Sequence, residues 1–383
     1  MHPFISLRRV WWPWCVLLLL SGCIDPYLPE GVGAAPNYLV VDGYLNSRGR
    51  SLIQLSRTYR LDQNTAPPRE TGATLFIEQQ DGPRFPLSET APGTYTSIPL
   101  NFSTESNYRL YILTAEGKEY ASAFMPAKVT PPIDSVTWRV NDNGLTIYVN
   151  SHDDTNSTQY YRWDFDETWE IVPTIIPQYE FRGGDVRLIS VPYPDVCWGN
   201  SPSTAVRLAK TTNLSQDRIA DFPLQSYPRT SERIGHKYSI LVRQFAQTRE
   251  EYQYWELLQK NTENIGTLFD PLPSQLTGNI RSLTDEGEVV LGYVGAYSRQ
   301  EKRIFISRAE LPGTWPYITG YESCSPPDTV LMKDVLAVFR GGFTVPVEQV
   351  FYSSGAIQGY TSTTLDCADC RKRGTAVRPN FWQ

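Results

Sequence analysis

The chain has 383 residues, of which 40% are hydrophobic and 20% are charged, so it is neither a disordered tail nor a polytopic membrane protein. The formal net charge is −6, which disfavours a role in nucleic-acid binding because no basic excess is present to neutralise phosphates. The chain is rich in Tyr (23), Trp (10), Pro (29) and Gly (26) and has only 3 Met, which favours short strands joined by turns over a helical bundle.

Residues 1–22 have the features of a lipoprotein signal peptide. Two arginines, Arg8 and Arg9, precede an apolar run of about 11 residues, which is too short to span a bilayer. The run ends in the sequence Leu-Ser-Gly-Cys at Cys23, which resembles the bacterial lipobox, in which the cysteine is lipidated and becomes the new N-terminus. The alternative is an ordinary signal peptide with a chance cysteine. We expect acyl chains on Cys23 to anchor the protein in a lipid bilayer without a membrane span.

Residues 23–36 contain prolines and glycines and are predicted to form a tether, and residues 37–125 are predicted to form a small all-β domain. Its spacing of strands and turns is typical of an immunoglobulin-like or transthyretin-like β-sandwich. Residues 126–132 are rich in proline and are predicted to be a linker. The expected strands are 38–41, 51–55, 73–77, 93–96, 108–113 and 119–121.

Residues 133–383 are predicted to form a second, larger β-rich domain with one short helix, so the whole chain is expected to be mainly β. Residues 135–140 and 145–149 form a predicted hairpin around Asn-Asp-Asn-Gly at 141–144. The helix begins with a capping-box pattern, in which Thr248 is followed three residues later by Glu251. Further strands are expected at 288–294 and 302–307, and Gly266 is the expected end of the helix.

Residues 159–170 (QYYRWDFDETWE) alternate aromatic and polar side chains, as a half-buried strand does. Tyr161, Trp163 and Trp169 are the predicted contacts for a partner or ligand, if their ring face points outward; the alternative is that such a row is core on one face. Asp164 and Asp166 lie two residues apart and so share a face. They suit either calcium or glycoside hydrolysis, or they belong to a solvated strand face.

Motifs for catalysis are scarce. Removal of the signal peptide leaves two histidines, and His152 lies in a polar loop beside Asp153, which favours a solvated loop over a catalytic base. The sequence holds no nucleophile elbow, phosphate-binding loop or zinc-protease motif. We therefore expect no enzyme activity, no cofactor and no metal site.

Four cysteines remain after the signal peptide and the lipidated cysteine are set aside: Cys197, Cys324, Cys367 and Cys370. An even number in an exported protein favours two structural disulfides over a redox pair or a zinc site. Long loops constrain the unfolded chain more than a Cys-x-x-Cys bridge does. We therefore expect Cys197 and Cys324 each to pair with one member of the Cys367/Cys370 pair.

Several motifs together resemble a Bacteroidota lipoprotein family that is catalogued as domain of unknown function 4249. The resemblance covers nearly the whole chain after the signal peptide, and its most specific part is the C-terminal stretch. The motifs are the lipobox, IDSVTW at 133–138, YYRWD at 160–164, Cys197-Trp198, LSQDRI at 214–219, EYQYW at 251–255 with NTEN at 261–264, QLTGN at 275–279, and CADCRKRG at 367–374 with RPNFW at 378–382. The family implies a lipid-anchored outer-membrane protein that is encoded beside a TonB-dependent receptor, with no known activity or ligand.

The leading hypothesis is a non-catalytic, lipid-anchored outer-membrane protein that is an accessory partner of a TonB-dependent β-barrel transporter, on either membrane face. One alternative is a solute-binding lipoprotein that captures a glycan or peptide with residues 160–169. A second is a surface hydrolase that uses Asp164 and Asp166. A deep pocket lined by Trp and Tyr would favour capture, and an apolar patch would favour a protein partner.

Two short motifs predict modification. Ser135 and Thr329 lie in Asp-Ser-Val and Asp-Thr-Val, which resemble the acceptor for O-glycosylation in exported Bacteroidota proteins, although about one match is expected by chance. A pair of prolines precedes each motif and favours an extended segment.

Substitution Cys23→Ala should abolish lipidation and leave the chain uncleaved or in the soluble fraction, because no acyl chain would then hold it in the bilayer. Detergent phase partitioning and mass spectrometry of the N-terminal peptide measure this. The lipoprotein hypothesis is wrong if the variant partitions like the wild type and the wild type carries no N-terminal acyl group.

Overall fold

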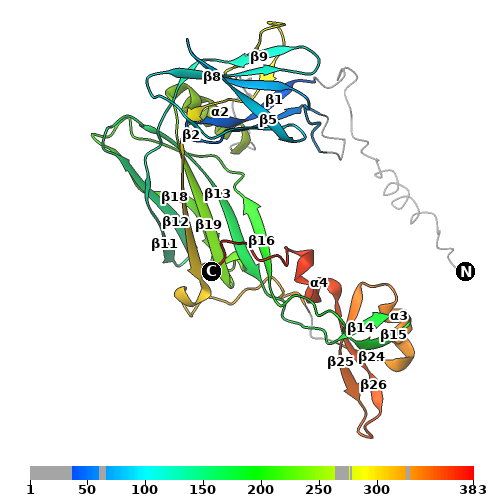
Figure 1. Ribbon diagram of the computed structural model, residues 1–383. Coiled ribbons are helices and arrows are strands. Elements are labelled where there is room, and N and C mark those ends of the chain that lie inside the picture. Colours follow the sequence, from blue (N-terminus) through cyan, green and yellow to red (C-terminus); the bar gives the residue numbers. More distant parts are fainter. Residues whose placement is uncertain (1–36, 60–65, 264–275, 277, 325–327) are drawn as a thin grey trace, which may run out of the picture.

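The computed structural model describes residues 37–59, 66–263, 276, 278–324 and 328–383. Figure 1 shows three β-rich units arranged along an arc, with the N-terminal unit at one end and a small C-terminal lobe at the other. The predicted class, mainly β with few and short helices, is confirmed. The predicted signal peptide, Cys23, the predicted tether and Gly266 lie outside the described residues.

The N-terminal unit is built on an 11-stranded sheet in the order β20-β9-β8-β4-β5-β6-β3-β1-β21, with β10 beside β8 and β22 beside β1. Strands that are far apart in this order, such as β1 and β8, contribute to one core, so the sheet folds back on itself. The strands before residue 127 are β1 (Leu39–Asn46), β2 (Arg48–Gly49), β3 (Leu52–Arg57), β4 (Thr74–Gln79), β5 (Arg84–Ala91), β6 (Thr94–Ser97), β7 (Leu100–Asn101), β8 (Asn107–Leu113), β9 (Glu119–Ser122) and β10 (Met125–Pro126).

The six strands expected in this unit are all present as β1, β3, β4, β6, β8 and β9. Strand β5 was missed because only one of its eight residues, Leu87, is buried, so the strand shows no hydrophobic alternation.

Residues 280–297 change the expected domain boundary. They form β20 (Ile280–Ser282), β21 (Val290–Leu291) and β22 (Ala296–Tyr297), which pair with β9 and β1 of the N-terminal unit. The expected linker is held there too, since the Lys128 N–H donates to the Ala296 carbonyl at 2.9 Å and the Thr130 N–H donates to Ser298 Oγ at 2.8 Å. The predicted strand at 288–294 is present only as the two residues of β21. The partners of these short strands are so distant along the chain that their pairing leaves no local pattern in the sequence.

The middle unit is a sandwich of two sheets. The first has the order β11-β12-β18 and consists of β11 (Ile133–Asn141), β12 (Gly144–Asp153) and β18 (Asp217–Pro228). The second has the order β16-β13-β19-β23, with β17 also on β13, and consists of β13 (Tyr160–Ile171), β16 (Cys197–Pro202), β17 (Arg207–Lys210), β19 (Lys237–Ala246) and β23 (Arg299–Ser307). Both sheets contribute to one buried core.

The predicted hairpin is confirmed as β11 and β12, in which Asn141 pairs with Gly144. The Asn141 side chain accepts the Asn143 N–H at 2.9 Å and the Gly144 N–H at 3.1 Å, which closes the turn. Gly144 has φ +153°, and a Cβ there would lie 1.9 Å from the Tyr227 carbonyl oxygen. Only glycine therefore lets β18 lie against the start of β12.

Helix α2 (Arg249–Glu263) follows β19, and Thr248 caps it as predicted, since its Oγ1 accepts the Glu251 N–H at 3.2 Å. Short turns of 3₁₀-helix occur at Glu232–Ile234, Arg308–Glu310, Met332–Asp334 and Cys370–Lys372.

The C-terminal lobe is defined here as residues 179–188 and 328–368. It contains the hairpin β14 (Tyr179–Arg182) and β15 (Asp185–Leu188), the sheet β24 (Asp328–Leu331), β26 (Ile357–Thr364) and β25 (Thr344–Phe351), and the short helices α3 (Val335–Phe339) and α4 (Leu365–Ala368). Its core has four buried residues, Val186, Val335, Phe339 and Tyr360. The expected domain over 133–383 is therefore divided between the middle unit, the lobe and three strands of the N-terminal unit.

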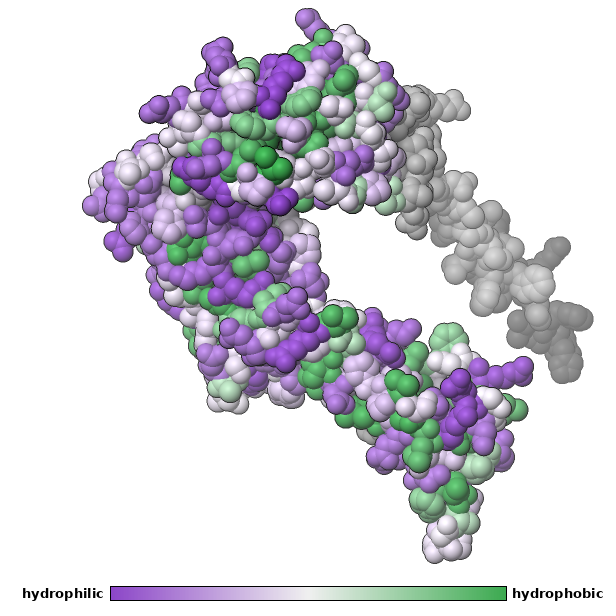
Figure 2. All heavy atoms as spheres, viewed as in Figure 1, coloured by the Kyte–Doolittle hydropathy of each residue, from purple (hydrophilic) through white to green (hydrophobic). Residues whose placement is uncertain are grey.

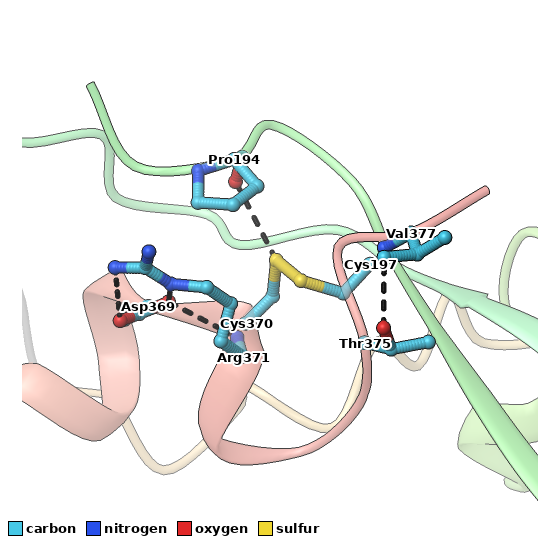
Figure 3. Close-up of a disulfide and its surroundings, with 7 residues drawn as sticks. All are labelled: Pro194, Cys197, Asp369, Cys370, Arg371, Thr375 and Val377. Carbon is cyan, nitrogen blue, oxygen red and sulfur yellow. Dashed lines mark hydrogen bonds and ion pairs between the residues drawn. A yellow bond between two sulfur atoms is a disulfide. The ribbon is translucent and has the colours of Figure 1, made fainter. Parts of the chain in front are cut away.

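Two disulfides lie at the base of the lobe. Cys197 at the start of β16 pairs with Cys370 (Figure 3). Cys324 pairs with Cys367 of α4. Figure 3 also shows Asp369 bound to the guanidinium of Arg371 by two contacts of 2.8 Å, beside the first bridge. The expected pairing of Cys197 and Cys324 with the two C-terminal cysteines is thus present, and it clamps the chain where it enters and leaves the lobe.

Peptide mapping without reduction should recover Cys197 linked to Cys370 and Cys324 linked to Cys367. No trypsin site separates Cys367 from Cys370, so cleavage on the N-terminal side of Asp369 is needed to resolve the two bridges. Removal of the first bridge by Cys197→Ser with Cys370→Ser should lower the free energy of unfolding by about 3–5 kcal/mol, because its loop spans 173 residues. A linked Cys367–Cys370 peptide or four free thiols would contradict the pairing.

Candidate functional site

The aromatic residues predicted to contact a partner belong to the core. Tyr161 and Trp163 are 0% and 1% exposed, so the prediction that they lie on an outward face is wrong. Trp163 Nε1 donates to Gln244 Oε1 at 2.8 Å, and its ring stacks on Phe222 across the sandwich at 4.7 Å. Trp169 is half-buried beneath the guanidinium of Arg233, whose Cζ lies 4.5 Å from the ring centroid. The register of β13 turns its odd-numbered residues 161–165 inward.

The two predicted carboxylates share one cation. Arg243, which is opposite Asp164 on β19, binds Asp164 through Nε and Asp166 through Nη1, the latter at 2.6 Å. Asp164 and Asp166 therefore do share a face, as expected, but they hold a common arginine and do not face each other across a cleft as a glycosidase pair does.

The same face of β13 carries a buried charge cluster. The guanidinium of Arg162 lies between the rings of Phe245 and Trp255, with its Cζ 4.4 and 4.6 Å from their centroids. Arg162 Nη1 lies 3.6 Å from Asp164 Oδ2. Helix α2 contributes Glu251, which is 1% exposed. The sequence predicts that the Glu251 side chain takes part in a capping box. In the structure that side chain faces inward, beside Arg162.

Burial raises the pKa of Glu251 to about 7, although the nearby Arg162 charge acts against that shift. Gln247 Nε2 and Trp255 Nε1 both donate to Oε1, at 3.2 and 3.3 Å. No described residue makes a well-aligned hydrogen bond to Oε2. The carboxyl group is thus poorly solvated in its charged form, and it titrates near neutral pH.

His152 lies in an acidic surface hollow. Its Nδ1 is 2.7 Å from Asp134 Oδ2 and its Nε2 is 3.7 Å from Asp154 Oδ1. The hydrogen bond to Asp134 raises the pKa of His152. The hollow is lined by Asp134, His152, Asp153, Asp154, Asn156, Gln216, Asp217 and Arg218, none of which is a serine, threonine or cysteine nucleophile.

The C-terminal lobe exposes large apolar side chains, which sequence reasoning missed. Helix α3 buries Val335 and Phe339 on one side and exposes Leu336 and Val338 on the other. Phe343, in the turn after α3, is 83% exposed. The β25–β26 hairpin adds a second exposed group at its tip, which consists of Phe351, Tyr352 and Ile357. Figure 2 shows hydrophobic residues, in green, among polar ones on the displayed face of the lobe.

The two predicted glycosylation residues differ in accessibility. Thr329 is exposed on β24, the edge strand of the lobe sheet. Ser135 is half-buried, and its Oγ accepts a hydrogen bond from Asn150 Nδ2 at 3.1 Å. Modification of either residue stays a prediction.

Substitution Glu251→Gln should stabilise the protein in alkaline solution. Below pH 4.5 the side chain is protonated in both folded and unfolded chains, so the two proteins should differ least there. As the pH rises to about 7 the unfolded wild type releases the proton and the folded wild type retains it, so wild-type stability falls. The variant lacks this loss and should gain on the order of 3 kcal/mol above pH 7 relative to its difference at pH 4.5.

Urea unfolding of both proteins from pH 4.5 to 8.5 measures this difference, and Glu250→Gln is the matched control because Glu250 is the exposed neighbour on the same helix. A stability difference between Glu251→Gln and wild type that is independent of pH would contradict the assignment of a raised pKa.

The comparison with known proteins supplies a family and no activity. The profile of the family described as "Domain of unknown function (DUF4249)" matches residues 24–303. No curated protein matches the chain. Among solved structures, a chitinase from Bacillus thuringiensis matches at 11% identity over 48% of this chain and 30% of that chain. The TM-score of 0.14 is too low to indicate a shared fold. The chain belongs to the DUF4249 family.

Proposed function

We propose that the protein is a non-catalytic, lipid-anchored accessory protein that binds a membrane partner through the C-terminal lobe. The observation that carries this proposal is the exposure of Leu336, Val338 and Phe343 on and beside one short helix. Exposed apolar groups of this kind typically mark contact surfaces on soluble domains. Aromatic residues such as Phe343 are enriched in the cores of protein interfaces.

The partner that best fits the proposal is a TonB-dependent β-barrel transporter of the outer membrane. The resemblance of the sequence to lipoproteins encoded beside such receptors supports this choice, as does the lipobox at Cys23. A lipid anchor followed by a tether keeps the lobe close to the membrane, where an embedded partner is available. In the described part of the chain, no helix is long and apolar enough to cross a membrane.

Two contacts support a binding role over the hydrolase alternative. Arg243 binds both Asp164 and Asp166, so the two carboxylates hold a common guanidinium and do not face each other across a cleft as a glycosidase pair does. His152 lies between carboxylates and not beside a nucleophile. The charged groups of the middle unit thus bind one another. The exposed apolar side chains of the lobe have no such partners within the described residues and are the proposed contacts with a binding partner.

Substitution Phe343→Ser should weaken co-purification of the barrel from native membranes. If Phe343 lies at the centre of the interface, its loss costs about 2 kcal/mol, or roughly thirtyfold in affinity. The measurement is a pull-down of the tagged, lipidated protein, with quantitative mass spectrometry of the proteins recovered.

Leu214→Ser is the matched control, because Leu214 is also an exposed apolar residue but lies in the middle unit. Both variants should keep the wild-type melting temperature, since both side chains are solvated. The proposal fails if wild type recovers no barrel, and the lobe is the wrong surface if both variants recover it equally.

A further inference from the structure

A groove lies where the N-terminal unit meets the middle unit. This junction groove has a volume of about 710 Å³. It is bordered by β1 and the 291–293 segment on one side and by β13, β19 and α2 on the other. Ligand sites occur preferentially at such domain junctions, because two units can approach one ligand from both sides.

Aromatic rings line much of the groove. Tyr44, Tyr254, Trp255 and Tyr293 are half-buried there. Tyr254 packs against Tyr293 at a centroid distance of 5.2 Å and against Trp255 at 5.6 Å, so these three rings form one continuous wall. Burial, with the nearby Asp42 charge, raises the pKa of Tyr254 to about 12, so its hydroxyl stays a neutral donor at physiological pH.

Two opposite charges at the groove have no ion pair or hydrogen bond with the described residues: Asp42 of β1 and Arg50. Both are exposed. By contrast, the other two arginines of the groove already have carboxylate partners, Arg162 with Asp164 and Arg299 with Glu301 at 3.0 Å. The groove therefore offers a free acceptor and a free donor beside an aromatic wall.

This combination selects among ligand classes. An anion would face the carboxylates of Asp42 and Asp164, and two of the three arginines that line the groove, Arg162 and Arg299, already hold carboxylate partners. An apolar ligand would bury the charges of Asp42 and Arg50 without partners. A peptide that binds by strand addition needs an unpaired strand edge, and β1, β13 and β19 each have neighbours on both sides. A neutral, polyhydroxylated ligand fits the groove best, since hydroxyl groups both donate to a carboxylate and accept from a guanidinium.

We propose that the junction groove binds a neutral oligosaccharide. The C–H faces of its sugar rings pack on Tyr254, Trp255 and Tyr293, and its hydroxyl groups bond to Asp42 and Arg50. The site uses the charged face of the 160–169 segment, through Arg162 and Asp164, and not its buried aromatic face. It is distinct from the lobe surface and does not depend on the transporter partnership.

The experiment is isothermal titration calorimetry of the full-length protein in detergent with a panel of neutral oligosaccharides, namely maltohexaose, cellohexaose, xylohexaose and mannohexaose. At least one should bind with a Kd of about 1 mM or tighter. Asp42→Asn and Arg50→Gln should each weaken that binding about tenfold or more, because each removes a charge-assisted hydrogen bond.

Matched controls are Asp142→Asn in the β11–β12 turn and Arg182→Gln on β14, which are exposed and lie outside the groove. The controls should bind as wild type does, and all four variants should keep the wild-type melting temperature. Absence of binding across the panel overturns the proposal, as does wild-type affinity in both groove variants. Binding of a decapeptide library in place of the sugars would show that the ligand class is wrong.

Discussion

Strand β13 carries opposite chemistry on its two faces, and the other elements of the middle unit are arranged around it. Tyr161, Trp163 and Phe165 fill the sandwich core, and Tyr161 OH donates to buried Asp217 at 2.9 Å. Arg162, Asp164 and Asp166 lie on the opposite face, where Arg243 and α2 cover them. A buried charge is tolerated only when it is paired. The charged face therefore requires β19 and α2 in their observed positions, and these elements in turn border the junction groove.

The sequence predicted the alternation in β13 but not its direction. A two-residue period shows that two faces differ, and it does not show which face is covered. In an ordinary half-buried strand the charged face meets water, and here helix α2 and the N-terminal unit cover part of it, above all Arg162. The aromatic residues were therefore assigned to a contact surface that does not exist, while Arg162 received no role. Glu251 is a similar case. The capping-box pattern is local and predicts that the Glu251 carboxyl group turns back to the helix start, whereas a tertiary contact with Arg162 places that group in the interior.

Non-local pairing explains the other differences. Strands β21 and β22 have two residues each and pair with β1, which lies some 250 residues earlier. A strand was predicted at 288–294, around β21, but no window of sequence contains the pairing of either strand with β1. The six strands of the N-terminal unit with clear hydrophobic alternation were predicted, as was the hairpin around Gly144, because their determinants are local. The sequence predicted that Cys197 and Cys324 each pair with one of the two C-terminal cysteines, since chain entropy favours long loops. Which of them pairs with Cys367 and which with Cys370 depends on the fold around α4.

The lobe shows why the bridges matter for the proposed contact surface. Its core has four fully buried residues, far fewer than the cores of the other two units. A core of that size rarely supports an independent fold without covalent staples. Cys324–Cys367 closes the 43-residue loop that holds β24, α3, β25 and β26, and Cys197–Cys370 fixes its base to β16 of the middle unit. Helix α3 can present Leu336 and Phe343 outward only while Val335 and Phe339 stay in that small core. The order of the lobe, and with it the proposed contact surface, therefore depends on the two bridges, and disulfides persist in an oxidising environment.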